Sequence, residues 1–158
     1  MELKAKTVEE SRTLQHYILL PKHLNDSGSL YGGQLLSWID MLAGVVALRH
    51  ADTPVVTASI DHLDFKTGAC KGDVLIMDGR VTWVGHSSME VRIDTYRKAH
   101  NEDKQLINTA FLVMVALDEN RHPKQIAGLE LMTDEERQEW EDGKKRAALR
   151  KHRRMENF

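Results

Sequence analysis

Cysteine is almost absent from this sequence, in which Cys70 stands alone among 158 residues. One cysteine cannot form an internal disulfide framework, and Cys70 has no neighbouring cysteine with which it would hold zinc. The N-terminus lacks an apolar run of signal-peptide length, and no run reaches the ~18 apolar residues that a spanning helix needs. These absences predict a protein of the reducing cytoplasm that is neither exported nor inserted in a membrane.

An excess of charge of either sign is missing as well. The 24 acidic and 22 basic residues leave a formal net charge of −2, so no overall field attracts nucleic acid or an anionic membrane. We expect neither as a partner, and any anion site must be local. The length suits one domain with a tail and is too short for two ordinary domains. We place the domain at residues 1–130 and a helical tail at residues 131–158.

Only three prolines interrupt the chain, and between them the apolar residues follow clear periods. Tyr31–His50 has no proline over about five helical turns and is predicted to form the central helix of the domain. Its apolar residues spread around much of the circumference, which is typical of a helix wrapped by other structure. Strands are predicted at Thr13–Leu20, Val55–Phe65, Asp73–Val84, Ser88–Tyr96 and Leu106–Leu117.

Alternation of apolar and charged residues in Ser88–Tyr96 is typical of a half-buried antiparallel strand. One buried helix and several long strands, with no further helix between those strands, predict an α+β fold in which an antiparallel sheet curls around the helix. The tail segment Thr133–Arg154 is predicted to be a separate helix that begins with a capping box of Thr133 and Glu136.

Asp40 is the most informative residue, because it is a carboxylate in the middle of a helix that otherwise reads as buried. An unpaired buried carboxylate is costly, and its position in mid-helix denies it the free amides of a helix N-terminus. Gly33, Ser37, Gly44 and Ala47 share its helix face, which is therefore small and carries one charge. Two interpretations follow: close helix packing with Asp40 hydrogen-bonded to a neighbouring strand, or a cleft that admits a ligand beside a general base.

Gly32 and Gly33 lie at the start of the helix, where free N–H groups can bind an anion or a developing oxyanion, although the pair could equally set a turn. Asn25 is likewise either a turn residue or an amide that polarises a carbonyl. Gly33 and Asp40 stand ~10 Å apart along one helix, so one reacting carbon cannot easily touch both. A second copy with its helix antiparallel would bring its Gly33 and Asn25 to Asp40 of the first copy. The sequence thus predicts a site shared within a dimer.

The run from Asn25 to Asp40, NDSGSLYGGQLLSWID, resembles the Asn-x-x-Gly-x-φ-aromatic-Gly-Gly…Asp signature of the cytosolic acyl-CoA hydrolases with a hotdog fold, where φ is apolar. Segments Val56–Phe65 and Val84–Met89 agree with the same family, so the resemblance covers roughly residues 13–130. It implies hydrolysis of acyl-CoA thioesters, a long helix wrapped by an antiparallel sheet, and dimers joined through their sheets. A trimer of dimers, that is a homohexamer, is also implied. Coenzyme A would be part of the substrate, so no cofactor is expected.

The resemblance also implies roles for individual residues. Asn25 and Asp40 match the catalytic pair, and the Gly33 amide would support the thioester carbonyl. Residues assigned to coenzyme A are Gly85, His86, Ser87, Ser88, Thr57 and Ser59. The turn at residues 85–88 offers hydroxyls, amides and an imidazole for a phosphate or pantetheine amide, although a simple hairpin link would look much the same.

Two weaker signals concern cations. The basic residues of the predicted tail helix are Lys144, Lys145, Arg146, Arg150, Lys151, Arg153 and Arg154. They could meet the phosphates of coenzyme A, but dipole matching and solvation are the favoured interpretation. Asp61, His62 and Asp64 invite a metal hypothesis. Because neighbouring strand residues alternate between faces, the three cannot converge locally, and no metal is predicted.

Two other functions are weighed against hydrolysis. A hotdog hydratase acting on enoyl thioesters would be expected to use a pair that contains histidine, and no histidine stands at the position of Asp40. A module that senses acyl-CoA would naturally carry a DNA-binding appendage, and the tail of mixed charge does not resemble one. Hydrolysis is therefore the predicted function, with Asp40 acting either as general base for water or as a nucleophile that forms an anhydride.

Overall fold

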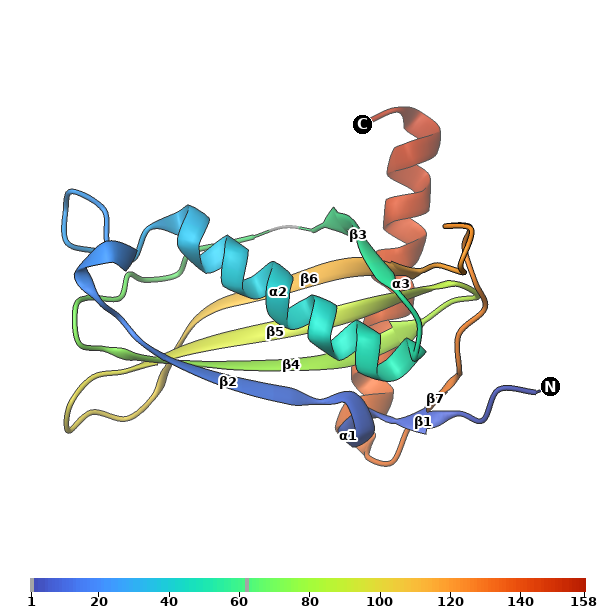
Figure 1. The fold of residues 1–158 in the computed structure, drawn as a ribbon, viewed down its shortest axis with the longest axis horizontal. Coiled ribbons are helices and arrows are strands. Elements are labelled where there is room, and N and C mark those ends of the chain that lie inside the picture. Colours follow the sequence, from blue (N-terminus) through green and yellow to red (C-terminus); the bar gives the residue numbers. More distant parts are fainter. Residues whose placement is uncertain (1, 62) are drawn as a thin grey trace.

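The computed structural model describes residues 2–61 and 63–158, in which α2 lies across one face of an antiparallel sheet and α3 across the other (Figure 1). The elements in chain order are β1 (Lys6–Thr7), α1 (Val8–Ser11), β2 (Thr13–Ile18), η1 (Pro21–His23), α2 (Gly32–Ala51), β3 (Val55–Ile60), β4 (Val74–Val84), β5 (Ser88–Lys98), β6 (Gln105–Ala116), β7 (Leu129–Glu130) and α3 (Asp134–Glu156). The sheet has five strands in the order β2-β4-β5-β6-β3, and β1 pairs with β7 separately. The predicted α+β class is confirmed, although β3 ends earlier than predicted.

Helix α2 packs its apolar side against the inner face of the sheet. Ile39, Leu42 and Val46 recur at helical spacing and are fully buried. At Gly79 of β4, a Cβ atom would lie 2.8 Å from Ile93 Cδ1 and 2.9 Å from Val46 Cγ2. Glycine at this position therefore allows the helix and the sheet to approach closely.

The opposite side of α2 is not covered within one chain. Met41 is 61% exposed and Leu48 is 50% exposed, although both are apolar. All five strands of the sheet contact α2, as expected of a helix wrapped by a sheet, but within one chain this side of the helix stays open. Strand β3 is an edge strand of the sheet and exposes Val56 and Ile60 in the same way. An unpaired strand edge beside apolar helix surface is typical of an interface with another chain.

The outer face of the sheet is covered by α3, and this corrects the prediction for the strand at Ser88–Tyr96. Its acidic residues were expected in solvent, but Glu90 is 0% and Asp94 3% exposed. Glu90 accepts hydrogen bonds from Arg146 at 2.8 Å and from Arg150 at 3.0 Å, both on α3. Asp94 pairs with Arg80 at 3.1 Å. A layer of buried ion pairs thus joins the helix to the central strands.

Helix α3 begins as predicted at Thr133, whose hydroxyl accepts a hydrogen bond from the Glu136 amide at 3.1 Å. The Glu136 carboxylate reaches back one residue further than a capping box requires and accepts from the Met132 amide at 2.6 Å. Solvation, the favoured interpretation for the basic residues of this helix, is wrong for Arg146 and Arg150, which pair with buried Glu90. Among the described residues, no helix is long and apolar enough to cross a membrane.

His50, in the last turn of α2, is buried without a charged partner. Its Nε2 lies 2.9 Å from the Ala127 carbonyl oxygen, whereas Nδ1 has no hydrogen-bond partner in the part of the chain that the structure describes. Burial lowers the pKa of His50 below its ordinary value, although the hydrogen bond to Ala127 opposes the change. The neutral ring with a proton on Nε2 is therefore the form that the fold accommodates.

The lowered pKa of His50 predicts an acid-sensitive fold. Below about pH 6.5 the unfolded chain protonates this histidine before the folded chain does, so the free energy of unfolding falls as the pH falls. The slope from this one group is at most about 1.4 kcal/mol per pH unit. Urea unfolding between pH 7.5 and 5.5, at fixed protein concentration, measures the effect. His50→Gln keeps an N–H donor without titrating and should flatten the pH dependence, and an unchanged slope would assign it to other groups.

Candidate functional site

Asp40 lies in the middle of α2 on the side that turns toward β3. Thr57 Oγ1 donates a hydrogen bond of 2.6 Å to Asp40 Oδ1, and Asp40 remains partly exposed. Both interpretations of Asp40 are therefore partly met, because the carboxylate is bonded to a neighbouring strand and is still accessible. No described residue donates a hydrogen bond to its second oxygen, which can therefore accept one from a ligand or water.

A β-bulge in the edge strand places Thr57 beside the helix. The pairing of β3 with β6 shifts between Thr57, opposite Met114, and Ser59, opposite Val113. The additional residue, Ala58, locally re-aims the strand, as bulges do next to functional sites. The sequence assigned Thr57 to coenzyme A and missed its bond to Asp40, since a bulge has no clear signal in the residue pattern.

Asn25 lies in the loop before α2 and is held there through its side-chain oxygen. Asn25 Oδ1 accepts hydrogen bonds from the amides of Ser27 at 3.0 Å and Ser29 at 3.1 Å. Gly28 closes the same loop with a φ of +76°, a conformation that favours glycine. No described residue accepts a hydrogen bond from the Asn25 amide nitrogen. The loop thus leaves the NH2 group as a donor that can meet a carbonyl oxygen.

Gly33 stands in the first turn of α2, where the first amides of a helix have no partner within the helix. A Cβ atom at Gly33 would lie 2.6 Å from Tyr31 Cε1, so the tyrosine ring can cover the helix start only because the residue is glycine. Tyr31 is the N-cap and makes no side-chain capping bond. The helix therefore begins with uncapped N–H groups and the positive end of its dipole, which suits an oxyanion.

One chain does not bring these groups together. Gly33 and Asp40 are separated by ~10 Å along α2, and no hydrogen bond joins Asn25 to Asp40 among the described residues. The turn at residues 85–88 lies at the end of the sheet where β3 begins, away from the start of α2. There the Ala116 amide, opposite Val55 of β3, donates a hydrogen bond of 2.9 Å to the Ser87 carbonyl oxygen. Backbone carbonyl groups of the turn thus accept hydrogen bonds from neighbouring segments of the chain. The His86 side chain is exposed. Ser59 is exposed on the edge of the sheet.

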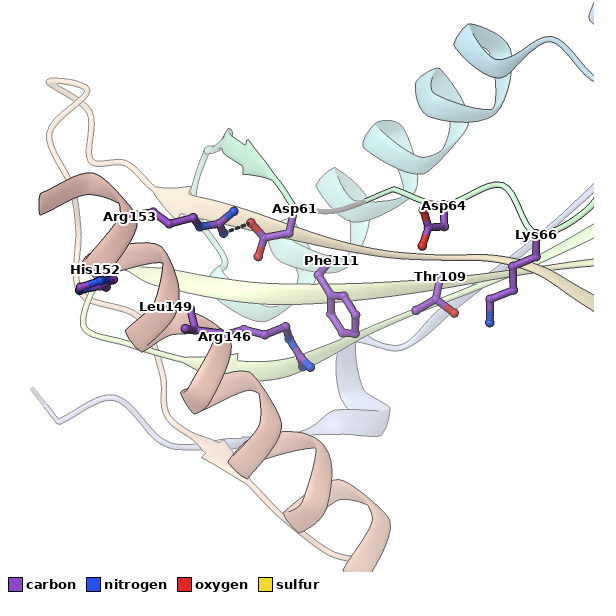
Figure 2. Close-up of a pocket in the computed structure, with 9 residues that line it drawn as sticks. All are labelled: Asp61, Asp64, Lys66, Thr109, Phe111, Arg146, Leu149, His152 and Arg153. Carbon is purple, nitrogen blue, oxygen red and sulfur yellow. Dashed lines mark hydrogen bonds and ion pairs between the residues drawn. The ribbon is translucent and has the colours of Figure 1, made fainter. Parts of the chain in front are cut away.

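A cavity of about 590 Å³ lies on the outer side of the sheet between β6, α3 and the segment that follows β3 (Figure 2). Arg146 lies over the Phe111 ring, with its guanidinium carbon 3.8 Å from the ring centroid, and Arg153 pairs with Asp61. Within residues 2–61 and 63–158, no three His, Cys, Asp or Glu side chains gather as a metal site. His62, part of the metal hypothesis, lies outside the described residues.

The fold and the site together define a hotdog domain, in which a long helix lies on an antiparallel sheet and carries the chemical groups. Solved structures of acyl-CoA thioesterases have the same architecture. An apo hexameric acyl-CoA thioesterase is 39% identical with a TM-score of 0.92 and matches over 96% of this chain and 97% of its own. The acyl-CoA hydrolase of Staphylococcus aureus is 32% identical with a TM-score of 0.91, over 97% and 94% of the two chains.

Relatives known by sequence agree. The chain is 35% identical to the uncharacterized acyl-CoA thioester hydrolase YkhA of Bacillus subtilis, over 92% of this chain and 86% of the relative. It is 31% identical to the cytosolic acyl coenzyme A thioester hydrolase of mouse, of which it spans 40%. The model of the thioesterase superfamily matches residues 27–104. The chain therefore belongs to the acyl-CoA thioesterase family of hotdog enzymes, and the predicted fold and family are confirmed.

Proposed function

We propose that this protein hydrolyses acyl-CoA thioesters to a free carboxylic acid and coenzyme A. The observation that carries the proposal is the accessible Asp40 carboxylate, held by Thr57 at 2.6 Å on a helix that starts with uncapped amides. Family membership supports the same reaction. The chemistry needs only water and acid–base groups, so no cofactor is required beyond the coenzyme A of the substrate.

In the proposed mechanism Asp40 removes a proton from a water molecule, and the water oxygen forms a bond to the thioester carbon. Negative charge develops on the carbonyl oxygen and is stabilised by the Gly33 N–H and the Asn25 amide. The tetrahedral intermediate collapses with loss of the C–S bond, and the proton on Asp40 passes to the departing thiolate. Alternatively, an Asp40 oxygen attacks the carbonyl carbon itself, and the C–S bond breaks to release the coenzyme A thiolate. Water then cleaves the resulting anhydride, which frees the acid, regenerates the Asp40 carboxylate and supplies a proton to the thiolate. Both routes use the same residues.

The proposed assembly is a homo-oligomer with a dimer as its minimal active unit, and a trimer of dimers as the complete form. It is supported by the uncovered side of α2 and the free edge of β3, and a similar thioesterase is hexameric. Coenzyme A is proposed to extend from the shared site toward the turn at residues 85–88. We propose a cytoplasmic location, because the related enzyme of mouse is named a cytosolic acyl coenzyme A thioester hydrolase. The S. aureus relative has been solved with butyryl coenzyme A and coenzyme A.

A turnover screen tests the proposed activity. The purified protein is incubated with acyl-CoA substrates of increasing chain length, and release of the free thiol is followed with a thiol reagent. We expect wild type to turn over at least one of these substrates. The Asp40→Asn variant should have almost no turnover with the same substrate. Tight binding of coenzyme A without release of thiol from any substrate would instead support a sensing module.

The shared site predicts complementation between two inactive variants. Asn25→Ala and Asp40→Ala should each be inactive alone, because every site in the homo-oligomer lacks one group. When the two are unfolded together and refolded, about half of the dimers are mixed if pairing is random. Each mixed dimer holds one intact site, so activity should return to roughly a quarter of that of wild type treated identically. Mixed oligomers that form and stay inactive would place each site within one chain.

The turn at residues 85–88 predicts an effect on substrate binding. Replacing Ser87 and Ser88 with alanine should raise KM several-fold and leave kcat nearly unchanged, because contacts with coenzyme A lie far from the bond that breaks. Steady-state kinetics at several chain lengths measure both constants. Ser27→Ala, in the loop before α2, is the matched control for the loss of a hydroxyl. A KM that does not change at any chain length would leave the turn as a connection only.

A further inference from the structure

Another cavity, of about 350 Å³, opens beside the start of α2. Its floor is made by Leu35 and Ala69, which are 0% exposed, and by Ile107, which is 2% exposed. Gly32 and Phe65 stand on its wall. None of its lining residues carries a charge, so an apolar ligand could enter it without removing an ion from water.

This cavity adjoins the group that is proposed to bind the thioester carbonyl. Gly32 lines it, and Gly33, the next residue along the chain, supplies the oxyanion amide. With a thioester carbonyl at that amide, the acyl chain begins one bond away from the carbonyl carbon and therefore starts beside Gly32. Resting on the proposed function, we propose that the cavity takes the acyl chain and that Phe65 and Gly68 at its wall set the chain length.

The other cavities suit an acyl chain less well. The cavity on the outer side of the sheet (Figure 2) is lined by charged residues that include Asp61, Lys66, Arg146 and Arg153. It also faces away from α2, because Phe111 alternates with buried Ala110 and Leu112 on the helix side of β6. An acyl chain bound there would be separated from Asp40 by the sheet.

The size of the cavity limits the acyl chain that it holds. If a methylene group occupies about as much space as a water molecule, roughly 30 Å³, a cavity of about 350 Å³ accepts on the order of ten carbons. Burial of each methylene up to that limit should raise kcat/KM about fourfold, which corresponds to ~0.8 kcal/mol per CH2 group. Longer chains should gain nothing further.

Phe65 is placed to close the cavity. It is 53% exposed although it is a large aromatic residue, and a Cβ atom at Gly32 would stand 3.4 Å from its Cζ. The ring thus lies against the start of the helix at the wall of the cavity. An exposed ring in this position has few contacts in the core, so its loss should change the cavity more than the stability of the fold.

Two variants change the cavity in opposite directions. Gly68→Leu should narrow it, because Gly68 lines the cavity and a Cβ atom there would make only an ordinary contact, 3.5 Å from Ser29 Oγ. Phe65→Ala should open it. The controls are Leu149→Trp, which fills the cavity on the outer side, and Phe158→Ala, which removes a ring that is 96% exposed.

The measurement is kcat/KM for butyryl-, hexanoyl-, octanoyl-, decanoyl- and myristoyl-CoA, below the concentrations at which they form micelles. Gly68→Leu should lower the ratio of decanoyl to butyryl turnover more than tenfold, because the side chain displaces about four methylene groups. Phe65→Ala should raise the ratio of myristoyl to decanoyl turnover at least threefold. Both control variants should keep the wild-type ratios.

Three results would overturn the assignment. Unchanged ratios in both cavity variants, with wild type active and all oligomers intact, would place the acyl chain elsewhere while the proposed function stands. A shift produced by Leu149→Trp alone would move the chain to the outer cavity. Absence of turnover by wild type with every substrate would reject the proposed function and the acyl pocket with it.

Discussion

Asp40→Asn is expected to lower kcat for acyl-CoA hydrolysis by about 10²–10⁴-fold, the usual contribution of a general base. The substitution keeps the volume of the side chain and one oxygen for Thr57, so the bond between α2 and β3 can persist. It removes only the capacity to take a proton or to attack a carbonyl carbon. Steady-state rates and sedimentation measured on the same sample separate catalysis from assembly.

The Asp40 experiment has a matched control in Asp103→Asn, which changes an exposed loop aspartate in the same way and should leave kcat at the wild-type value. Thr57→Val should lie between the two, because it removes the hydroxyl that orients the carboxylate and leaves the carboxylate itself. An Asp40→Asn variant with near-normal turnover would make this residue structural. A variant that loses activity together with its oligomer would show that Asp40 holds the interface.

Glu90→Gln is expected to lower the free energy of unfolding by about 3–5 kcal/mol, the usual cost of removing one partner from a buried ion pair. Burial alone would raise the pKa of Glu90, but hydrogen bonds from Arg146, Thr82 and Arg150 hold that pKa below its ordinary value. The glutamine cannot neutralise two guanidinium groups. The Arg150 side chain is only 9% exposed. Its remaining partner would be Asp61, which also pairs with Arg153.

Denaturant unfolding at fixed protein concentration measures the loss, and Glu141→Gln on the exposed side of α3 is the control, with an expected change within about 0.5 kcal/mol. Because the pKa of Glu90 is lowered, its stabilisation should be complete near neutral pH and should be lost as the pH falls below about 4.5. Equal stabilities of the two variants at pH 7 would mean that the Glu90 ion pairs contribute no net stability. Helix α3 would then be held by its other contacts, which include the Glu139 pairs with Arg80 and Arg92 and the Trp83 and Trp140 rings with centroids 6.2 Å apart.

Local patterns in the sequence were sufficient for α2, α3 and the five strands of the main sheet, but not for the short elements β1, α1, η1 and β7. The spacing of apolar residues in Tyr31–His50 predicted α2 to within one residue at each end, because a helix repeats its environment every three or four residues. Alternation and turn residues located the strands in the same way. The strand predicted at Val55–Phe65 was too long by the most residues, since β3 ends at Ile60. Beyond that end, Asp61 and Lys66 still donate backbone hydrogen bonds to β6.

Residues of the candidate site were also visible before the structure. Asp40 attracted attention because a charge in mid-helix needs a reason, and the glycine pair because a helix start with small residues leaves its amides open. The bond from the Thr57 hydroxyl to Asp40 was not predicted, because a one-residue bulge decides which neighbour the hydroxyl meets. A pattern of residue types does not record that shift of register.

Tertiary structure alone decided which surfaces are covered. The sequence of β5 alternates as a half-exposed strand should, yet its acidic residues are buried because α3, more than forty residues later in the chain, packs over them and supplies their arginines. Helix α2 shows the reverse: its apolar residues predicted burial on most sides, and Met41 and Leu48 are exposed within one chain. The spacing of apolar residues predicts which side of an element is buried, but it does not say which other segment or chain covers that side. The sequence by itself thus determined the elements, the family and the chemical groups, whereas long-range packing decided their partners, because a side chain pairs with whatever the fold brings near it.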